Sequence, residues 1–312
     1  MANPYTADAL LLPALKRRGM LPNTSETLAD ADYYALANDE IQSYIVPLLL
    51  KAREEHLIQT HDITLVSGTD TYALPYRAAG GKVRDVWLST RAEGGFKQMQ
   101  RIEPERVGDY ASSGSPSGFR FEGNNLIVVP TPGPAGGTVR IKYHAMPNRL
   151  VAVSACAVVS SYVTATKTIT TVATVPSTFG ATVSLDIVRG KPGFDSLAQD
   201  NVAVSAATTS IVMTDALSAQ ILGGTASTGD YVCLSGESPI PQIPLSLHPL
   251  LAQRVVYRSL EAIGDPKAAG ALASCQELER LSLTLLSPRS DGNSRAVVNR
   301  YGPGFRHNWR FR

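Results

Sequence analysis

The chain has 312 residues, of which 44% are hydrophobic and 18% charged, and its formal net charge is +2 at pH 7. Such a composition can build a sizeable core, and the near-neutral charge leaves no overall basic footprint for nucleic acid. No apolar run reaches the roughly eighteen residues of a membrane span. The first residues do not show the basic-then-apolar pattern of a signal peptide, so none is expected. The cysteines, Cys156, Cys233 and Cys275, are too scattered for a metal site or a disulfide framework, which fits synthesis in a reducing cytoplasm.

Two helices are predicted near the N-terminus. Residues 5–18 have an amphipathic helical pattern. A second helix is predicted to begin near Thr27-x-x-Asp30, which resembles a capping box, and it could continue to about His56. Pro47 should bend this helix near its end, because proline lacks the backbone N–H that the helix would use there.

From residue 60 the alternation of apolar and polar residues changes to a period of two, which predicts a small antiparallel β domain over residues 60–146. Turns are expected at residues 67–70, at Gly94-Gly95 and at residues 123–125, with strands on either side. The last strand, TVRIKYHA, is predicted to place Val139, Ile141 and Tyr143 on one face and Arg140, Lys142 and His144 on the other.

The composition shifts after Pro147. Residues 151–235 are rich in Val, Ala, Thr and Ser and carry few charges, and their short β-prone runs predict a second, sandwich-like unit. Uncharged edge strands are poorly protected against pairing, so we expect neighbours in an assembly to cover them. Residues 237–249 are proline-rich and are predicted to form an exit linker.

Helical signals return after this linker. Pro249 is typical of the first turn of a helix, and Gly264 is typical of a helix end. Asp265-Pro266 is typical of the start of a second helix, so the pattern predicts a helical hairpin. Pro288 should end the second helix. The predicted buried stripes are Leu251, Val255, Ser259 and Ala262 on the first helix, and Leu272, Cys275, Leu278, Ser282 and Leu285 on the second.

The order of these elements predicts an α+β fold. Helical segments at both ends have apolar faces that need partners, so we expect a helical bundle domain built from both termini, with antiparallel β domains inserted. The predicted units are a helical domain of residues 1–59 plus 245–288, an antiparallel β domain of residues 60–147, a sandwich-like β domain of residues 148–244, and an extended C-terminal arm of residues 289–312.

The C-terminal arm, residues 289–312, has an unusual composition. It holds six arginines, no lysine and one acidic residue, so its charge is about +5. Four aromatic residues lie among these arginines, and Gly302-Pro303-Gly304 forbids a regular helix through the middle. Arginine and aromatic side chains are frequent interface anchors, so the arm is predicted to dock on a partner. A disordered tail, or a segment that binds single-stranded nucleic acid or RNA, remains an alternative.

Enzyme signatures are missing from the pattern. The five histidines form no metal-binding spacing, and the sequence has no P-loop, no dinucleotide-binding glycine motif and no nucleophile elbow. We therefore expect no catalytic residue, no cofactor and no metal site. Trp87 lies in an apolar strand and is more often core than binding platform in such a context.

Several segments together resemble the head-to-tail adaptor proteins of tailed bacteriophages, also called connector or neck proteins, and the podovirus-like portal adaptors in particular. They are LLPALKRRGMLP, the helix LADADYYALANDEIQSYIVPLLLKAREEH, the strand pair ending TYALP, the RIEPER segment, the hairpin GFRFEGNNLIVVPTP, and the C-terminal helix pair with its basic tail. The resemblance covers residues 5–147 and 245–312 and leaves the 151–235 module without an assigned role.

This resemblance implies a structural protein that forms a ring, usually of twelve copies, beneath the portal in the virion neck between capsid and tail. The ring would pass double-stranded DNA through its channel without sequence-specific binding, and tail, nozzle or fibre proteins would attach to it. Another fibre- or tail-associated virion protein, or a nucleic-acid-binding protein, is the alternative. The portal-binding residues implied by position are Arg295, Arg300, Tyr301, Phe305, Arg306, Trp309, Arg310 and Phe311.

Overall fold

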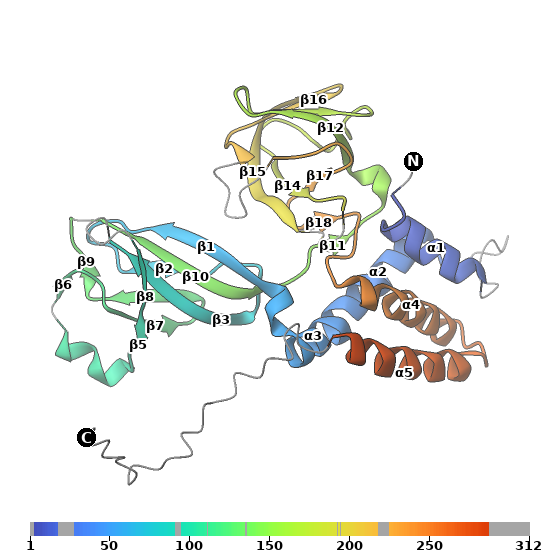
Figure 1. Ribbon diagram of the computed structural model, residues 1–312, viewed down its shortest axis with the longest axis horizontal. Coiled ribbons are helices and arrows are strands. Elements are labelled where there is room, and N and C mark those ends of the chain that lie inside the picture. Colours follow the sequence, from blue (N-terminus) through green and yellow to red (C-terminus); the bar gives the residue numbers. More distant parts are fainter. Residues whose placement is uncertain are drawn as a thin grey trace, which may run out of the picture.

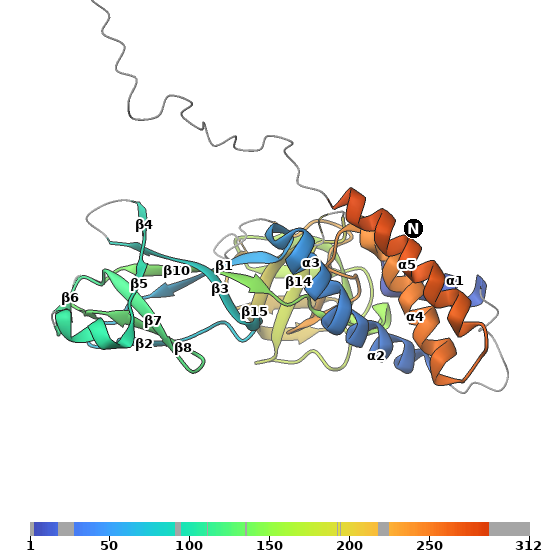
Figure 2. The same cartoon turned by 90° about the horizontal axis from the view of Figure 1, so that it is seen from below.

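A computed structural model of the chain combines helices and strands, which confirms the predicted α+β class. A helical cluster and an open β part lie at opposite ends of the long axis, and a β-barrel stands between them on one side (Figures 1 and 2). The structure describes residues 3–17, 28–90, 95–110, 112–134, 136–191, 193, 195–217 and 225–286.

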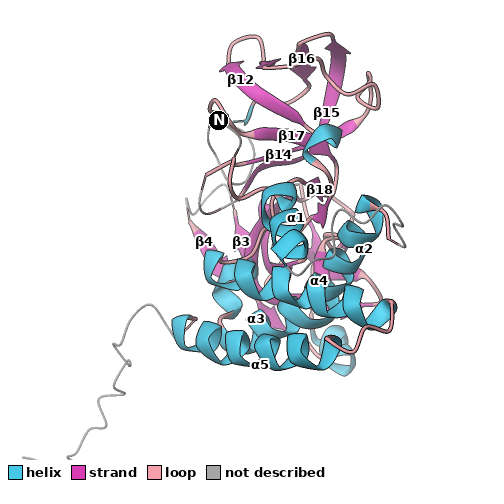
Figure 3. Cartoon of the chain, turned by 90° about the vertical axis from the view of Figure 1, so that its right-hand side faces the viewer, coloured by secondary structure: helices cyan, strands magenta, loops and turns pink. Residues whose placement is uncertain are grey.

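The helical cluster draws on both ends of the chain. One buried core joins Leu11, Ile45 and Leu49 from the N-terminal part to Leu251 and Val255 from the C-terminal part. The segments that meet there are α1 (Ala7–Arg17), α2 (Asp30–Glu40), η1 (Ile41–Ile45), α3 (Val46–Ala52), α4 (His248–Ala262) and α5 (Ala268–Leu285). In the view of Figure 3, α5 lies on the side of the cluster farthest from the barrel.

The second predicted helix is a composite. The regular α2 is followed by the π-helical turn η1, and α3 begins just before Pro47. A π-turn lets the backbone continue past the hydrogen bond that Pro47 cannot donate, which explains the departure from regular geometry near this residue. The α-helix ends at Ala52, and a short 3-10 turn, η2 (Glu54–Leu57), leads into the first strand.

The predicted hairpin of α4 and α5 is present. Gly264 has φ of 71°, and the amide of Asp265 donates to the carbonyl of Leu260 at 2.9 Å, which closes the end of α4. Asp265 does not itself cap α5, because the N-cap is Lys267, whose amide donates to the Asp265 carboxylate. The predicted stripes run one turn too far on both helices: Ala262 and Leu285 are exposed.

The open β part consists of two small sheets packed face to face around Val139, Ile141, Leu126 and Val128. The first sheet has the order β1 (Ile58–Thr64), β10 (Thr138–Ala145), β3 (Ala78–Ser89) and β4 (Phe96–Gln98). The second has the order β2 (Thr71–Ala73), β8 (Asn125–Val129), β7 (Gly118–Glu122) and β5 (Gln100–Arg101). A short pair, β6 (Ser113–Gly114) with β9 (Thr131–Pro132), and the 3-10 turn η3 (Pro104–Asp109) complete this part.

Two predicted hairpins, β3–β4 and β7–β8, are confirmed, and Gly123 turns the second with φ of 58°. The strands on either side of residues 67–70 do not pair with each other, because β1 joins β10 and β2 joins β8. The β5–β7 and β6–β9 pairs are parallel, so this part is not purely antiparallel. His144, predicted on the polar face of its strand, is buried beside register shifts in β10.

The third unit is a closed barrel rather than the predicted sandwich-like pair of sheets. Closure pairs the strands with one another, so it removes the unprotected edges that the sequence led us to expect. Leu185, Ile187, Ile169 and Val232 are among the side chains that fill its interior. Its strand order is β12 (Ala157–Val163), β13 (Thr168–Thr171), β16 (Ser210–Met213), β15 (Ser196–Ala207), β14 (Ser184–Val188) and β17 (Tyr231–Leu234).

The chain enters and leaves the barrel side by side. β11 (Arg149–Leu150) pairs in parallel with β18 (Glu237–Ser238), and the 3-10 turns η4 (Val153–Ala155) and η6 (Leu245–Leu247) flank them. The predicted exit linker is therefore packed structure, since Ile240, Ile243 and Leu247 are buried.

Candidate interaction surfaces

The predicted portal-binding residues lie outside the described residues, as does the whole arm of residues 289–312. The helix that leads to the arm is described. Near its end, Leu281 and Leu285 are 47% and 68% exposed, and their spacing of four places them on one face of α5. An apolar patch therefore lies on the helix surface shortly before the arm begins.

A charged cluster joins α5 to the other helices. Glu40 of α2 is buried and accepts hydrogen bonds from Arg254 and from Arg258, the latter at 2.6 Å. The Arg254 guanidinium stacks over the ring of Tyr44 at 3.5 Å, and the Tyr44 hydroxyl donates to Glu279. Burial and this contact with Glu279 raise the pKa of Tyr44 to about 12. These contacts tie α2, η1, α4 and α5 together, so the arm starts from a rigid base.

A second cluster joins the open β part to the barrel. Arg77, in the loop between β2 and β3, forms two hydrogen bonds with Asp186 of β14, at 2.7 Å and 2.9 Å. The two side chains are only 6% and 0% exposed. Asn148, which lies just before β11, donates to the same carboxylate at 2.7 Å. Three segments far apart in the sequence thus meet at one buried charge pair.

The remaining donors of Arg77 are also paired. Its guanidinium contacts Asp200 at 3.1 Å and the hydroxyl of Ser235 at 3.1 Å, and its Nε donates to the hydroxyl of Tyr76. Burial alone would lower the pKa of Arg77, but the hydrogen bonds and charge of Asp186 outweigh it and the pKa is raised. Arg77 therefore remains charged throughout the physiological range.

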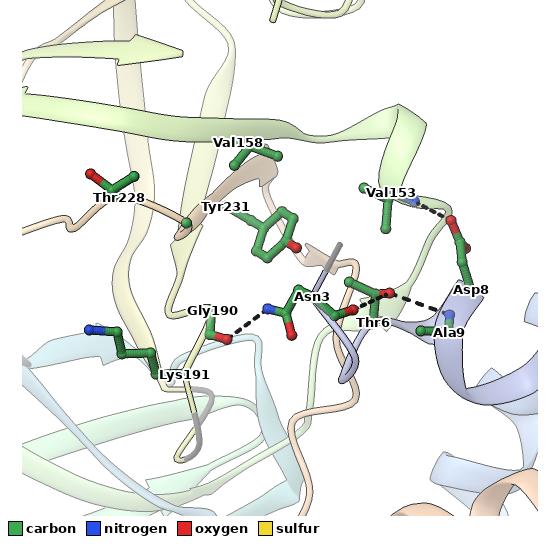
Figure 4. A pocket seen from close by; sticks show the side chains of 11 residues that line it. Asn3, Thr6, Asp8, Ala9, Val153, Val158, Gly190, Lys191, Thr228 and Tyr231 are labelled. Carbon is green, nitrogen blue, oxygen red and sulfur yellow. Dashed lines mark hydrogen bonds between the residues drawn. The ribbon is translucent and has the colours of Figure 1, made fainter. Parts of the chain in front are cut away.

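A third contact joins α1 to the barrel around a pocket of about 590 Å³ (Figure 4). The side chain of Asn3 donates to the carbonyl of Gly190 at 2.7 Å, and the Asp8 carboxylate accepts from the amide of Val153 and the hydroxyl of Tyr34. Burial raises the pKa of Asp8, and the Val153 hydrogen bond partly offsets this. Because both Asp8 oxygens already accept hydrogen bonds from neighbouring segments, the role of this carboxylate is structural.

Among the described residues, the cysteines and histidines show no reactive arrangement. Cys156 and Cys233 pack in one buried cluster, and burial, with a hydrogen bond from the Cys233 thiol to Cys156, raises the pKa of that thiol. A raised thiol pKa disfavours the reactive thiolate. Burial also lowers the pKa values of His144 and His248, which keeps both neutral. Within the described part of the chain, no three metal-ligating side chains come together.

A family model described as SU10 adaptor protein matches residues 6–167, which is more than half of the chain. The chain belongs to the SU10 adaptor protein family. This confirms the resemblance to phage head-to-tail adaptors, which are structural proteins. The match includes the N-terminal helices, the open β part and β12, and it ends just before β13, so most of the barrel lies beyond it. No curated protein matches this adaptor. No helix in the described ranges is both long and apolar enough to cross a membrane.

The buried cluster around Arg77 was not predicted from the sequence. One signal was available: Asp186 is the single charged residue of β14, SLDIV, whose other positions are apolar or small. A charge in a buried strand needs a partner. The pattern could not name that partner, because Arg77 lies 109 residues away in the chain.

Proposed function

We propose that this protein is the head-to-tail adaptor of a tailed bacteriophage. Copies of it form a ring, twelve by family resemblance, beneath the portal in the virion neck, and the ring extends the DNA channel. The C-terminal arm docks on the portal, and tail, nozzle or fibre proteins attach to the outer parts. The observation that carries the proposal is the family match over residues 6–167, which takes in the N-terminal helices and the open β part.

The base of the arm supports a docking role. From residue 287 to residue 312 the chain has 26 residues, which span up to about 90 Å when fully extended. This is long enough to reach across a neighbouring subunit or along a second protein. The exposed Leu281 and Leu285 lie close to the start of this segment, so a partner that receives the arm can bury apolar helix surface as well.

The distribution of charge supports a channel that DNA can slide through. The arm carries about +5, whereas the other 288 residues hold 23 Lys and Arg against 26 Asp and Glu. A slight negative balance of the body disfavours tight binding to DNA, because affinity for DNA comes mostly from cations that neutralise phosphates. Weak contact suits a passage through which the genome has to move.

The test compares full-length protein with a chain truncated after residue 288, each mixed with the portal of the same virion, and measures the mass of the assembly. We expect the full-length chain to form a ring on the portal, and the truncated chain to fold but not to dock. Undiminished docking of the truncated chain would refute the role of the arm.

Single substitutions in the arm refine this test. Trp309→Ala should weaken docking more than Arg312→Ala, because buried aromatic anchors usually contribute more than charges at the rim of an interface. Equal losses, together with a steep decrease of binding at high salt, would show that electrostatic attraction dominates instead. A nucleic-acid shift assay with the same variants tests the alternative function of the arm.

A further inference from the structure

Four neighbouring strands of the barrel present an uncharged surface to solvent. Their side chains alternate: Ile169, Ile211 and Met213 are buried in the barrel, so the residues between them face outward. None of the residues at positions 160–163, 168–171, 202–207 and 210–213 is charged. We call the outward side chains of β12, β13, β16 and β15 the neutral face; they are Ser161, Val163, Thr168, Thr170, Val204, Ser205, Ala207, Ser210 and Val212.

The register shows that this face is continuous. Val163 of β12 pairs with Thr168, Thr168 pairs with Val212 of β16, and Val212 pairs with Ser205 of β15. A second row runs in the same way from Ser161 through Thr170 and Ser210 to Ala207. Val204 lies at a register shift in β15 and is 57% exposed, and Val163 is 48% exposed. Two complete rows of side chains therefore cross four strands without a charge.

The first sheet of the open β part offers a comparison within the same molecule. Its outward residues also form rows, and these rows are charged: Asp62 of β1 pairs with Arg140 of β10, and Lys142 of β10 pairs with Asp85 of β3. Such charges keep an exposed sheet soluble and discourage non-specific contact. The barrel lacks this protection on the neutral face, so this surface is suited to being covered.

We infer that the neutral face is a docking surface for a different protein of the virion, one whose own contact surface is uncharged and built from apolar and hydroxyl side chains. The inference rests on the proposed function and adds a role for the barrel. Charge decides the chemistry of the occupant. A polyanion or a strongly basic partner finds no counter-charge within the two rows, and Lys167 at their edge already donates to the carbonyl of Thr214. Burying the charges of such a partner would cost free energy.

The geometry argues against a second copy that would bind this face with its own neutral face. A neighbouring copy that covered it with a different surface would show itself as a loss of self-association in the variants described below. Contact between two identical faces is isologous and relates the copies by a two-fold axis, whereas the copies in a ring are related by one common rotation axis. Face-to-face contact would therefore join two rings. In addition, β13, β15 and β16 lie beyond the end of the family match at residue 167, which fits a partner particular to this virion.

The experiment places a lysine on the neutral face of the full-length chain, as Val204→Lys or Thr170→Lys. Both side chains face outward, from different strands, so neither substitution removes a core contact. The matched control is Thr64→Lys, at an exposed position on β1 of the charged sheet. Thermal unfolding verifies that each variant is folded. Each purified tail protein of the same virion is then tested for binding to the portal–adaptor complex, at about 0.05 M and about 0.5 M salt.

We expect one tail protein to bind the unmodified complex with an affinity that changes less than about twofold with salt, since no surface charge is involved. Both neutral-face variants should lose about tenfold or more of this affinity, and Thr64→Lys should lose none. Portal docking should be the same for all of them.

Several results would overturn the inference. The first is that the neutral-face variants bind the tail proteins as well as the unmodified chain does. The second is that no tail protein binds the unmodified complex. The third is that the variants lose self-association of the adaptor instead of tail binding. Portal docking separates the two proposals. Failure of the unmodified chain to assemble on the portal refutes the proposed function, whereas normal assembly with unaffected tail binding refutes only the role of the neutral face.

Discussion

The buried pair of Arg77 and Asp186 should be essential for the stability of the joint between the open β part and the barrel. We consider the substitutions Arg77→Met and Asp186→Ala, which each leave one charged or polar group of the cluster without its partner. Removal of one member of a buried ion pair costs about 3–5 kcal/mol, because the other charge stays buried and uncompensated. The near-complete burial of both side chains places this pair in that class.

The hydrogen bonds predict which substitution is worse. Without Arg77, the Asp186 carboxylate keeps three donors, namely the side chain of Asn148 and the amides of Asp200 and Gly236. Without Asp186, those three donors lose an acceptor, at about 1–3 kcal/mol for each one that stays buried and unpaired. Asp186→Ala should therefore destabilise the protein more than Arg77→Met.

The assay is urea denaturation, followed by far-UV circular dichroism for the whole chain and by tryptophan fluorescence, measured in a Trp309→Phe background so that Trp87 reports the open β part. Arg140→Met is the matched control, because Arg140 and Asp62 form a pair of the same two-pronged geometry, at 2.8 Å, with side chains 35% and 34% exposed. An exposed pair contributes about 0–1 kcal/mol. Equal losses of stability for Arg77→Met and Arg140→Met would refute the reasoning from burial.

Three further predictions concern the core, the barrel and the response to acid. Leu285→Ser should change stability by less than about 0.5 kcal/mol, whereas Leu251→Ala in the helical core should cost about 2–5 kcal/mol; comparable effects in thermal melts would contradict the observed burial. Gly190→Ala should lower the melting temperature, because its Cβ would lie 2.1 Å from the carbonyl oxygen of Gly229. Burial lowers the pKa values of His144 and His248 from 6.5, so the unfolded chain binds protons first and stability should fall as the pH drops below about 6.5; a flat pH profile in urea titrations would contradict this.

Local patterns were sufficient to predict most helices and two hairpins. The apolar spacing of α4 and the Gly264-Asp265-Pro266 junction each depend on residues close in the sequence, and the structure shows the helical hairpin they predicted. The errors lie at the helix ends. Leu285 continues the periodic pattern of α5, but no other segment of the described chain covers it, and periodicity alone does not reveal where a neighbouring element stops.

Strand pairing was harder to predict than strand position. The strands on either side of residues 67–70 were located, yet they belong to different sheets, because β1 pairs with β10 and β2 with β8. The closure of the barrel depends likewise on pairs such as β12–β17, which are distant in the sequence. Alternation shows that a segment is a strand but does not identify its neighbours. The arm was recognised because its signal is local composition, and its proposed contacts stay predictions.

The contacts around Arg77 also bear on how the barrel presents its neutral face. The barrel is held by Arg77 from the open β part, by Asn3 from the N-terminal segment, and by the strand pair β11–β18. Three separate attachments fix its orientation on the body, so all barrels of a ring would present this face in the same direction.

Arg77→Met loosens one attachment without touching the face or the arm. We therefore expect the folded variant to dock on the portal normally and to bind its tail partner more weakly, because a reoriented barrel loses the avidity of simultaneous contacts around the ring. If Arg77→Met lowers the stability as predicted but leaves the affinity for the tail protein unchanged, tail binding does not depend on the orientation of the barrel.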